Sequence, residues 1–158
     1  MPYTTAIVCL NGHILTYSAD HTHQDIKHCP KCGSELIRSC PSCGSPIHGR
    51  EIKKGTATYT KTPPESFCYN CGSPYPWTES EFENAELIIN ELDCLSDAEK
   101  EKLRLSLRDL YTETPKTDYA VVLVKKAMMK CAGVLKDILV DMLVQFCCAA
   151  VKAKLGIT

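Results

Sequence analysis

The chain has 158 residues, enough for one ordinary domain or two small ones, and a formal net charge of −1 at pH 7. Residues 1–78 carry seven Lys or Arg and five Asp or Glu, and the remaining residues carry eleven and fourteen. Neither half has the basic excess of a protein that binds nucleic acid mainly through its charge. The unusual feature of the composition is its eleven cysteines.

The N-terminal stretch at residues 3–10 is rich in apolar and β-branched residues, which predicts a strand. It leads into Cys9-Leu-Asn-Gly-His13, where the Asn-Gly pair favours a tight turn that brings His13 beside Cys9. Residues 14–17 are the predicted returning strand. Residues 18–28 are polar and are predicted to form a loop, whose histidines are alternative metal ligands: His21, His23 and His28.

Three copies of the phrase Cys-x-x-Cys-Gly-Ser follow, beginning at Cys29, Cys40 and Cys68. This spacing places two thiolates on one turn, and the glycine permits the positive φ that carries the backbone around the sulfur atoms. Thiolates in this arrangement favour tetrahedral Zn²⁺. With the first turn they supply eight ligands, enough for two closed sites: Cys9, His13, Cys29 and Cys32, then Cys40, Cys43, Cys68 and Cys71.

The intervals between the pairs favour two consecutive, rubredoxin-like zinc ribbons. Seven residues separate Cys32 from Cys40, and twenty-four separate Cys43 from Cys68. A cross-braced arrangement, as in a RING domain, is the alternative. In it the first and third ligand pairs bind one metal ion, and the second and fourth pairs bind the other. Such domains normally have a much shorter interval between the second and third pairs.

Two other readings of the cysteines are less consistent with the sequence. A disulfide-rich secreted scaffold normally follows a signal peptide, and none is visible at the N-terminus, so we expect a cytoplasmic protein with metal-bound thiols. A catalytic zinc needs an open coordination position, whereas eight ligands can close both sites. No Ser/His/Asp set, phosphate-binding glycine loop or paired-carboxylate phrase indicates an enzyme.

The interval before the last Cys-x-x-Cys contains a small group of basic and aromatic residues. Alternating apolar residues on both sides of Lys53-Lys54-Gly55 predict a hairpin or two strands between residues 46 and 60. Five side chains are candidates for contact with nucleic acid or a protein partner: Arg50, Lys53, Lys54, Tyr59 and Lys61. Trp77, the only tryptophan, is expected to pack against the last Cys-x-x-Cys turn rather than to bind a ligand.

The composition changes after Thr78, where a predicted helical domain at residues 78–158 follows the zinc domain at residues 1–77. Thr78-Glu-Ser-Glu81 is a capping-box pattern, which predicts the start of a helix that carries Phe82, Leu87 and Ile88 and could extend to Leu92. Ser96-Asp-Ala-Glu99 is a second one, followed by an apolar face of Leu103, Leu107 and Leu110.

From Asp118 a helical pattern runs almost to the C-terminus, with Gly133 as a candidate hinge. Its apolar register contains Ala120, Val124, Ala127, Cys131, Leu135, Ile138, Met142, Phe146 and Ala149. A second group widens this stripe: Leu139, Val140, Leu143, Val144, Cys147 and Val151. So broad an apolar surface predicts that residues 118–156 mediate self-association, the alternative being that the segment folds back at Gly133. Its charged residues exclude a membrane span, and Cys94, Cys131, Cys147 and Cys148 fit no metal spacing and are expected to be small apolar core residues.

The four ligand turns, together with Gly49 and the sequence Tyr75-Pro76-Trp77, resemble those of a bacterial family of uncharacterised proteins. That family has paired zinc ribbons at the N-terminus and a helical tail. The segments around residues 95–99 and 114–117 resemble its tail. The resemblance implies zinc binding and an α+β fold, and it implies no activity.

The sequence therefore predicts a non-catalytic protein that binds two Zn²⁺ ions per chain. We expect an interaction or adaptor module whose ribbons present loops to a protein partner, or which self-associates through its C-terminal helices. A nucleic-acid-binding ribbon protein and an enzyme with an open zinc site are the alternatives.

Overall fold

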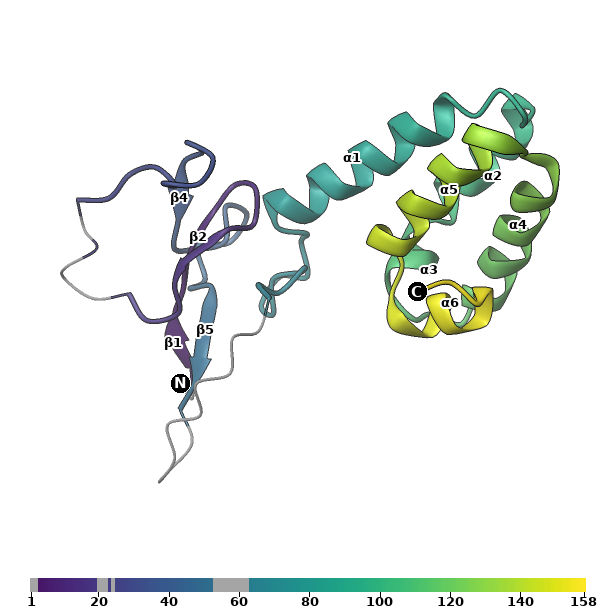
Figure 1. The fold of residues 1–158 in the computed structure, drawn as a ribbon. Helices are drawn as coiled ribbons and strands as arrows, with labels where there is room; N and C mark the ends of the chain where they lie inside the picture. Colours follow the sequence, from purple (N-terminus) through teal and green to yellow (C-terminus); the bar gives the residue numbers. More distant parts are fainter. Residues whose placement is uncertain (1–2, 20–22, 24, 53–62) are drawn as a thin grey trace. The chain divides into compact units, whose positions relative to one another are not determined.

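The computed structural model describes residues 3–19, 23, 25–52 and 63–158. The chain divides into two compact units, residues 1–80 and 81–158. Short strands form most of the regular structure of the first unit, and helices form the second (Figure 1). The predicted α+β class, with small ribbons before an all-α tail, is therefore confirmed. The division into a zinc domain at residues 1–77 and a helical domain at residues 78–158 stays a prediction.

The described part of the first unit contains two small antiparallel sheets. Its strands are β1 (Tyr3–Thr5), β2 (Ile7–Cys9), β3 (Ile14–Thr16), β4 (Leu36–Ile37) and β5 (His48–Glu51). β2 lies between β3 and β4, and β1 pairs with β5. The strands predicted at residues 3–10 and 14–17 are confirmed. Of the predicted hairpin, the part at residues 53–60 lies outside the described residues.

The N-terminal segment at residues 3–9 belongs to both ribbons. Its second half, β2, pairs with β4, which follows the turn that begins at Cys29. Its first half, β1, pairs with β5, which follows the turn that begins at Cys40. Between them, Ala6 N donates a hydrogen bond to Ile47 O at 2.9 Å. The ribbons are thus joined through one shared segment, which the prediction of two consecutive ribbons did not include.

Gly49 allows the close approach of β5 to the first ribbon. A Cβ atom at this position would lie 1.9 Å from Tyr17 O and 2.7 Å from Thr4 Oγ1. The neighbouring Arg50 N donates to Tyr17 O at 3.1 Å and to Thr4 Oγ1 at 2.7 Å. Any larger residue at position 49 would push β5 away from these backbone contacts, which explains why the motif has a glycine there.

Six helices, named in Figure 1, follow the strands. They are α1 (Pro76–Asn90), α2 (Asp97–Leu105), α3 (Leu107–Tyr111), α4 (Thr117–Lys130), α5 (Gly133–Phe146) and α6 (Ala149–Leu155). All six helices contribute to the core of the second unit, α1 from Phe82 onward. The largest fully buried side chains there include Ile89, Leu107, Leu139 and Leu143. The predicted burial of Leu103, Leu107 and Leu110 is confirmed.

The first helix begins earlier than predicted. Thr78 does not cap it but lies buried in its first turn, and Tyr75 O accepts the first backbone hydrogen bonds, from Thr78 N at 2.9 Å and Glu79 N at 3.0 Å. The reason is Pro76, because proline is favoured at the first helical position and disfavours a helical residue before it. Of the apolar residues predicted for this helix, Leu87 is 65% exposed, whereas Ala85 and Ile89 are buried. The second capping box is confirmed, since Ser96 and Glu99 exchange both hydrogen bonds.

The C-terminal segment is three helices rather than one. The chain is extended at Cys131 and Ala132, and again at Cys147 and Cys148. Cys148 N donates to Leu110 O at 3.1 Å, so the second break is fixed by a contact with α3. An apolar surface broader than one stripe is buried here by folding the segment back on itself, as in the alternative that the sequence left open.

This folding removes most of the surface on which predicted self-association rested. Leu139, Leu143, Cys147 and Val151 are buried within one chain, and Val140 and Val144 are half-buried. Ile138, in contrast, is 40% exposed and lies outside the core. Among the described residues, none of the helices has the length and apolar character needed to cross a membrane.

Cys94 and Cys131 correct another prediction, because they form a disulfide with their Cα atoms 5.3 Å apart. It joins the loop between α1 and α2 to the end of α4. The sequence predicts both as small apolar core residues, because they fit no metal spacing; 37 positions separate them in the sequence, so no local pattern indicates the bond. Cys147 remains a free buried thiol, and burial raises its pKa to about 12.

Candidate metal centres

The three Cys-x-x-Cys turns have one backbone geometry. In each, the N–H of the glycine donates to the carbonyl of the first cysteine at 2.8–2.9 Å, and the N–H of that cysteine donates to the carbonyl of the following serine at 2.8 Å. Gly33, Gly44 and Gly72 have φ of 74°, 74° and 71°. These left-handed positions are what glycine permits, and they wrap the backbone around the two sulfur atoms.

In the turn from Cys9 to His13 the two ligands are one residue further apart, but the backbone hydrogen bonds close one residue earlier. Gly12 N donates to Cys9 O at 2.9 Å, Cys9 N donates to His13 O at 3.0 Å, and Gly12 has φ of 81°. The backbone N–H of His13 also donates to Cys9 Sγ at 3.3 Å. Trp77 lies against this turn, with its Cβ atom 3.1 Å from where a Cβ on Gly12 would be. It also belongs to the buried cluster that contains Cys68 of the last turn, so it packs among the ligand turns as predicted.

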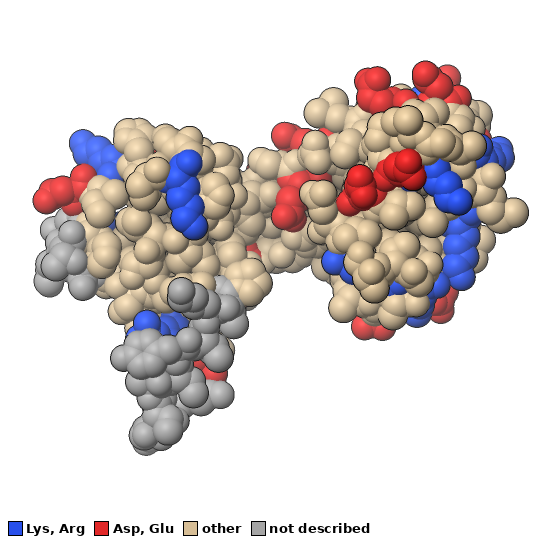
Figure 2. Space-filling model, in the orientation of Figure 1, with Lys and Arg blue, Asp and Glu red and all other residues tan. Residues whose placement is uncertain are grey.

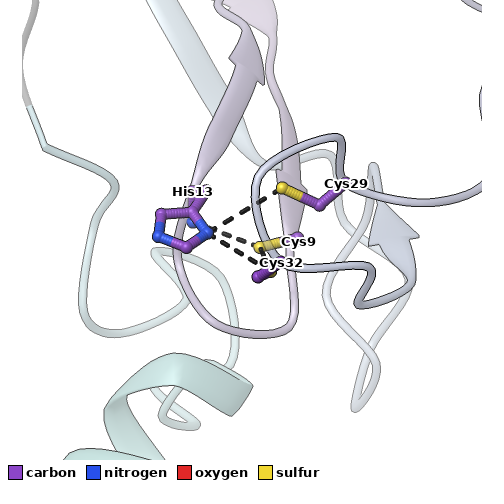
Figure 3. Close-up of side chains that lie close together, drawn as sticks. All are labelled: Cys9, His13, Cys29 and Cys32. Atoms are coloured by element: carbon purple, nitrogen blue, oxygen red, sulfur yellow. Dashed lines mark hydrogen bonds between the residues drawn. The ribbon is translucent and has the colours of Figure 1, made fainter.

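The first cluster brings together Cys9, His13, Cys29 and Cys32 (Figure 3). Cys9 ends β2, His13 precedes β3, and the two other cysteines lie on the turn before β4. The Nδ1 atom of His13 is 3.3 Å from Cys32 Sγ and 3.8 Å from Cys29 Sγ, and Cys9 Sγ is 3.7 Å from Cys32 Sγ. The ring of His13 points at the sulfur atoms, which makes Nδ1 the candidate ligand atom.

The second cluster brings together Cys40, Cys43, Cys68 and Cys71. Cys40 Sγ is 3.7 Å from Cys71 Sγ, and Cys43 Sγ is 3.7 Å from Cys68 Sγ. In both clusters all ligand atoms lie within 4.8 Å of one another. The structure therefore groups the eight residues in sequence order and not in the cross-braced order. It leaves their action as ligands a prediction.

The spacing of these atoms fits a tetrahedral metal ion. A zinc ion lies about 2.3 Å from a thiolate sulfur, so two sulfur atoms of one tetrahedron are roughly 3.8 Å apart. One sulfur–sulfur separation in the first cluster and two in the second are 3.7 Å. Each cluster could thus hold a metal ion with four protein ligands.

The surroundings of the sulfur atoms differ within each cluster. Cys9 and Cys40 are buried, and burial raises the pKa of both thiols. Cys32 and Cys43 are exposed, and hydrogen bonds from the serine two positions later lower their pKa values to about 5 and about 6. At these pKa values each cluster has one exposed sulfur that is deprotonated at neutral pH. The thiolate is the form that binds metal.

The chain also matches the model of a known family over residues 2–155. The family is described as "Uncharacterized protein conserved in bacteria (DUF2321)". The chain belongs to this family. The family resemblance that we drew from the ligand turns is therefore confirmed. No significant match was found among curated proteins or among solved structures.

Two asparagines in this DUF2321 chain support the clusters and were missed in the sequence. Asn11 Nδ2 donates to Cys32 Sγ at 3.5 Å and to Ser34 Oγ at 2.8 Å. Asn70 Nδ2 approaches Cys43 Sγ at 3.7 Å. Each lies two positions after the first cysteine of its own turn and reaches the sulfur of the opposite turn. The shared phrase Cys-x-Asn at Cys9 and Cys68 was the available signal.

The predicted contact surface is described only in part. Arg50 lies in β5 and lines an open hollow of about 550 Å³ with His13, Tyr17 and Lys31. The other four candidates, Lys53, Lys54, Tyr59 and Lys61, lie outside the described residues. Close to β5 is an aromatic stack that the sequence did not predict. In it His48 lies between Tyr3 and Tyr69, with ring centroids 4.2 Å and 3.9 Å apart.

Proposed function

We propose that the chain is a non-catalytic zinc protein in which two structural Zn²⁺ ions hold a surface for a protein partner. The ligands are Cys9, His13, Cys29 and Cys32 for the first ion, and Cys40, Cys43, Cys68 and Cys71 for the second. The observation that carries this proposal is the match between the sulfur separations of 3.7 Å and the edge of a zinc–thiolate tetrahedron.

A structural role is supported by the number of ligands. Catalytic zinc sites keep one position for water or substrate, whereas each cluster here supplies four ligand atoms. The alternative of an enzyme with an open zinc site requires one of these residues to stay unbound. Zinc is favoured over other metals because the donors are seven thiols and one imidazole in tetrahedral groups.

Elemental analysis of the protein, purified without chelator, tests the proposal. We expect two zinc ions per chain, and thiol titration of the same sample should find the seven ligand cysteines protected from alkylation. One zinc per chain with all thiols intact would contradict the two-site proposal. X-ray absorption at the zinc edge separates the enzyme alternative, because an open site would show an oxygen ligand.

The partner surface that we favour is formed by the ribbon loops and the Tyr3–His48–Tyr69 stack. Aromatic side chains are enriched in protein interfaces, and Tyr3 and Tyr69 are 37% and 42% exposed. The same stack beside Arg50 also suits the bases of single-stranded nucleic acid, which is the second candidate. Oligonucleotide binding whose affinity falls steeply with salt concentration would support that candidate. If no oligonucleotide binds even at low salt, the protein partner is favoured.

A further inference from the structure

The second unit contains a groove between α1 and α5 that plays no part in the metal clusters. Its volume is about 280 Å³. Apolar side chains form its floor: Ala85, Ile88, Ile138, Met142 and Phe146. Phe146 is fixed there by edge and tilted ring contacts with Phe82 and Tyr111, at centroid distances of 5.2 Å and 5.1 Å. Ala85, Met142 and Phe146 belong to the packed core, Ile88 is half-buried against it, and Ile138 is 40% exposed, so most of the floor is preformed.

The two walls have the spacing that receives a helix. α1 contributes positions 81, 84, 85 and 88, and α5 contributes 138, 141, 142, 145 and 146. On each helix these positions repeat every three or four residues, so each wall is one helical face about two turns long. A helix that lies in such a groove inserts side chains at i, i+3 or i+4, and i+7.

The rim is acidic. Glu81 lies on one wall and Asp141 on the other, with Asn84 and Gln145 as neutral polar neighbours. None of the described residues that line the groove is Lys or Arg. Tyr111 donates a hydrogen bond to Glu81 at 2.6 Å, which holds that carboxylate at the rim. α1 carries four glutamates and no basic residue. Figure 2 shows acidic groups gathered on the face of the helical unit where α1 and α5 lie.

We propose that this groove docks an amphipathic helix of a partner protein whose apolar side chains are flanked by Lys or Arg. The apolar floor accounts for the affinity, and the two carboxylates select a basic flank. This surface lies outside the ribbons, so the proposal goes beyond the function proposed above and does not depend on the metal ions.

Fluorescence anisotropy with two labelled model peptides tests the proposal on the full zinc-loaded chain. Both peptides are helical with Leu at i, i+3 and i+7, one with Lys on each side of the leucines and one with Glu. We expect saturable binding of the Lys peptide and at least about tenfold weaker binding of the Glu peptide, as expected for two exposed charge contacts that change sign. Equal binding of both peptides, or binding of neither, overturns the proposal.

Three variants locate the binding. Asp141→Lys should weaken the Lys peptide about tenfold and strengthen the Glu peptide, whereas Glu86→Lys, which makes the same charge change on α1 outside the groove, should have a much smaller effect. Ile138→Ala should weaken both peptides. Equal effects of Asp141→Lys and Glu86→Lys overturn the proposal. A dimer in sedimentation that Asp141→Lys converts to a monomer also overturns it, because a second copy then fills the groove. Zinc content is measured on every variant, so failure here is distinct from failure of the zinc proposal.

Discussion

The two units of this chain use cysteine in different ways. In the first unit the described core cluster has seven buried residues, two of which are the candidate ligands Cys40 and Cys68. In the second unit the cluster has eighteen, and its one disulfide lies at the edge of a helical core. Short strands with so small a core need cross-links to fold, whereas packed helices gain most of their stability from apolar burial. Metal binding should therefore decide the stability of the first unit and have little effect on the stability of the second.

The largest expected effect follows from removing a zinc ligand. Cys71→Ser changes an exposed sulfur, so little packing is lost, yet it opens the second cluster. Structural zinc contributes roughly 10–16 kcal/mol of apparent binding free energy in small zinc domains, which is folding free energy. We expect zinc to fall from two ions to one per chain and amide signals of the second ribbon to lose dispersion. Helical circular dichroism should remain nearly unchanged.

Cys148→Ser is the matched control for this change. It also replaces a thiol by a hydroxyl, but at the cap of α6, where serine is a favoured residue. Zinc content and ribbon signals should stay as in the wild type. If Cys71→Ser abolished the helical signal as well, the two units would not differ in the way that we describe.

The next effect reverses the comparison, because the disulfide belongs to the helical unit alone. Cys94 and Cys131 are 37 residues apart, and closing a loop of that length restricts the unfolded chain by about 4 kcal/mol in the loop-entropy model. Cys94→Ala should therefore lower the melting temperature of the helical unit strongly and leave zinc content at two. Calorimetry in the presence and absence of a phosphine reductant measures it: the reductant should destabilise the wild type and have no effect on Cys94→Ala.

Alkylation of the protein under non-reducing conditions checks the same bond by mass spectrometry. Cys94 and Cys131 should be protected until reduction. Their alkylation in the folded wild type, with an unchanged melting temperature in Cys94→Ala, would contradict the prediction. Thiol trapping in cells also tests the expected cytoplasmic location, since a reducing compartment would keep this pair as thiols.

The sequence predicted what local spacing determines. Each ligand pair lies on one turn of four or five residues, so the turn geometry and the glycines identified all eight candidates. The capping box at Ser96 was found for the same reason. The disulfide was missed because it joins two distant loops and has no local pattern. The hinge proposed at Gly133 lies at the first helix break, directly after Cys131 and Ala132. The sharing of the segment at residues 3–9 by both ribbons and the second break at Cys147 were missed, because tertiary contacts decide them.

Loss of the asparagine amides should produce a smaller effect, confined to the first unit. Groups that hydrogen-bond to metal ligands typically change metal affinity by 10–100-fold when removed. Asn11→Ala and Asn70→Ala should each weaken one cluster by about this factor, and competition with a chromogenic zinc chelator measures it. Asn11 should have the larger effect, because its amide also holds Ser34. Asn84→Ala, which changes an exposed asparagine of α1, should leave both affinities unchanged.

The smallest effect concerns a charge in the helical unit, near the disulfide. Glu99 lies beside Lys130, the residue before Cys131, and accepts hydrogen bonds from Ser96 N at 2.9 Å and Ser96 Oγ at 3.0 Å. The Lys130 ammonium, followed by the Ser96 hydrogen bonds, lowers the pKa of Glu99 from 4.5 to about 2. A carboxyl group whose pKa is lower in the folded state contributes stability that is complete above its unfolded pKa and is lost as the pH falls toward its folded pKa.

We therefore expect Glu99→Gln to lower the melting temperature of the helical unit slightly at pH 7, by about 2 °C, because the pair with Lys130 is exposed. Glutamine keeps the capping box, so the change removes the charge and not the cap. The difference between wild type and variant should be constant from pH 7 to about pH 5 and should shrink as the pH falls from 4.5 toward 2, where the wild-type carboxylate becomes protonated. Zinc loss at low pH affects both proteins and cancels in this difference. Glu101→Gln, which removes only the ion pair with Arg104 within α2, is the control. If the difference in melting temperature between wild type and Glu99→Gln grew as the pH fell, Lys130 would not stabilise the charged form of Glu99.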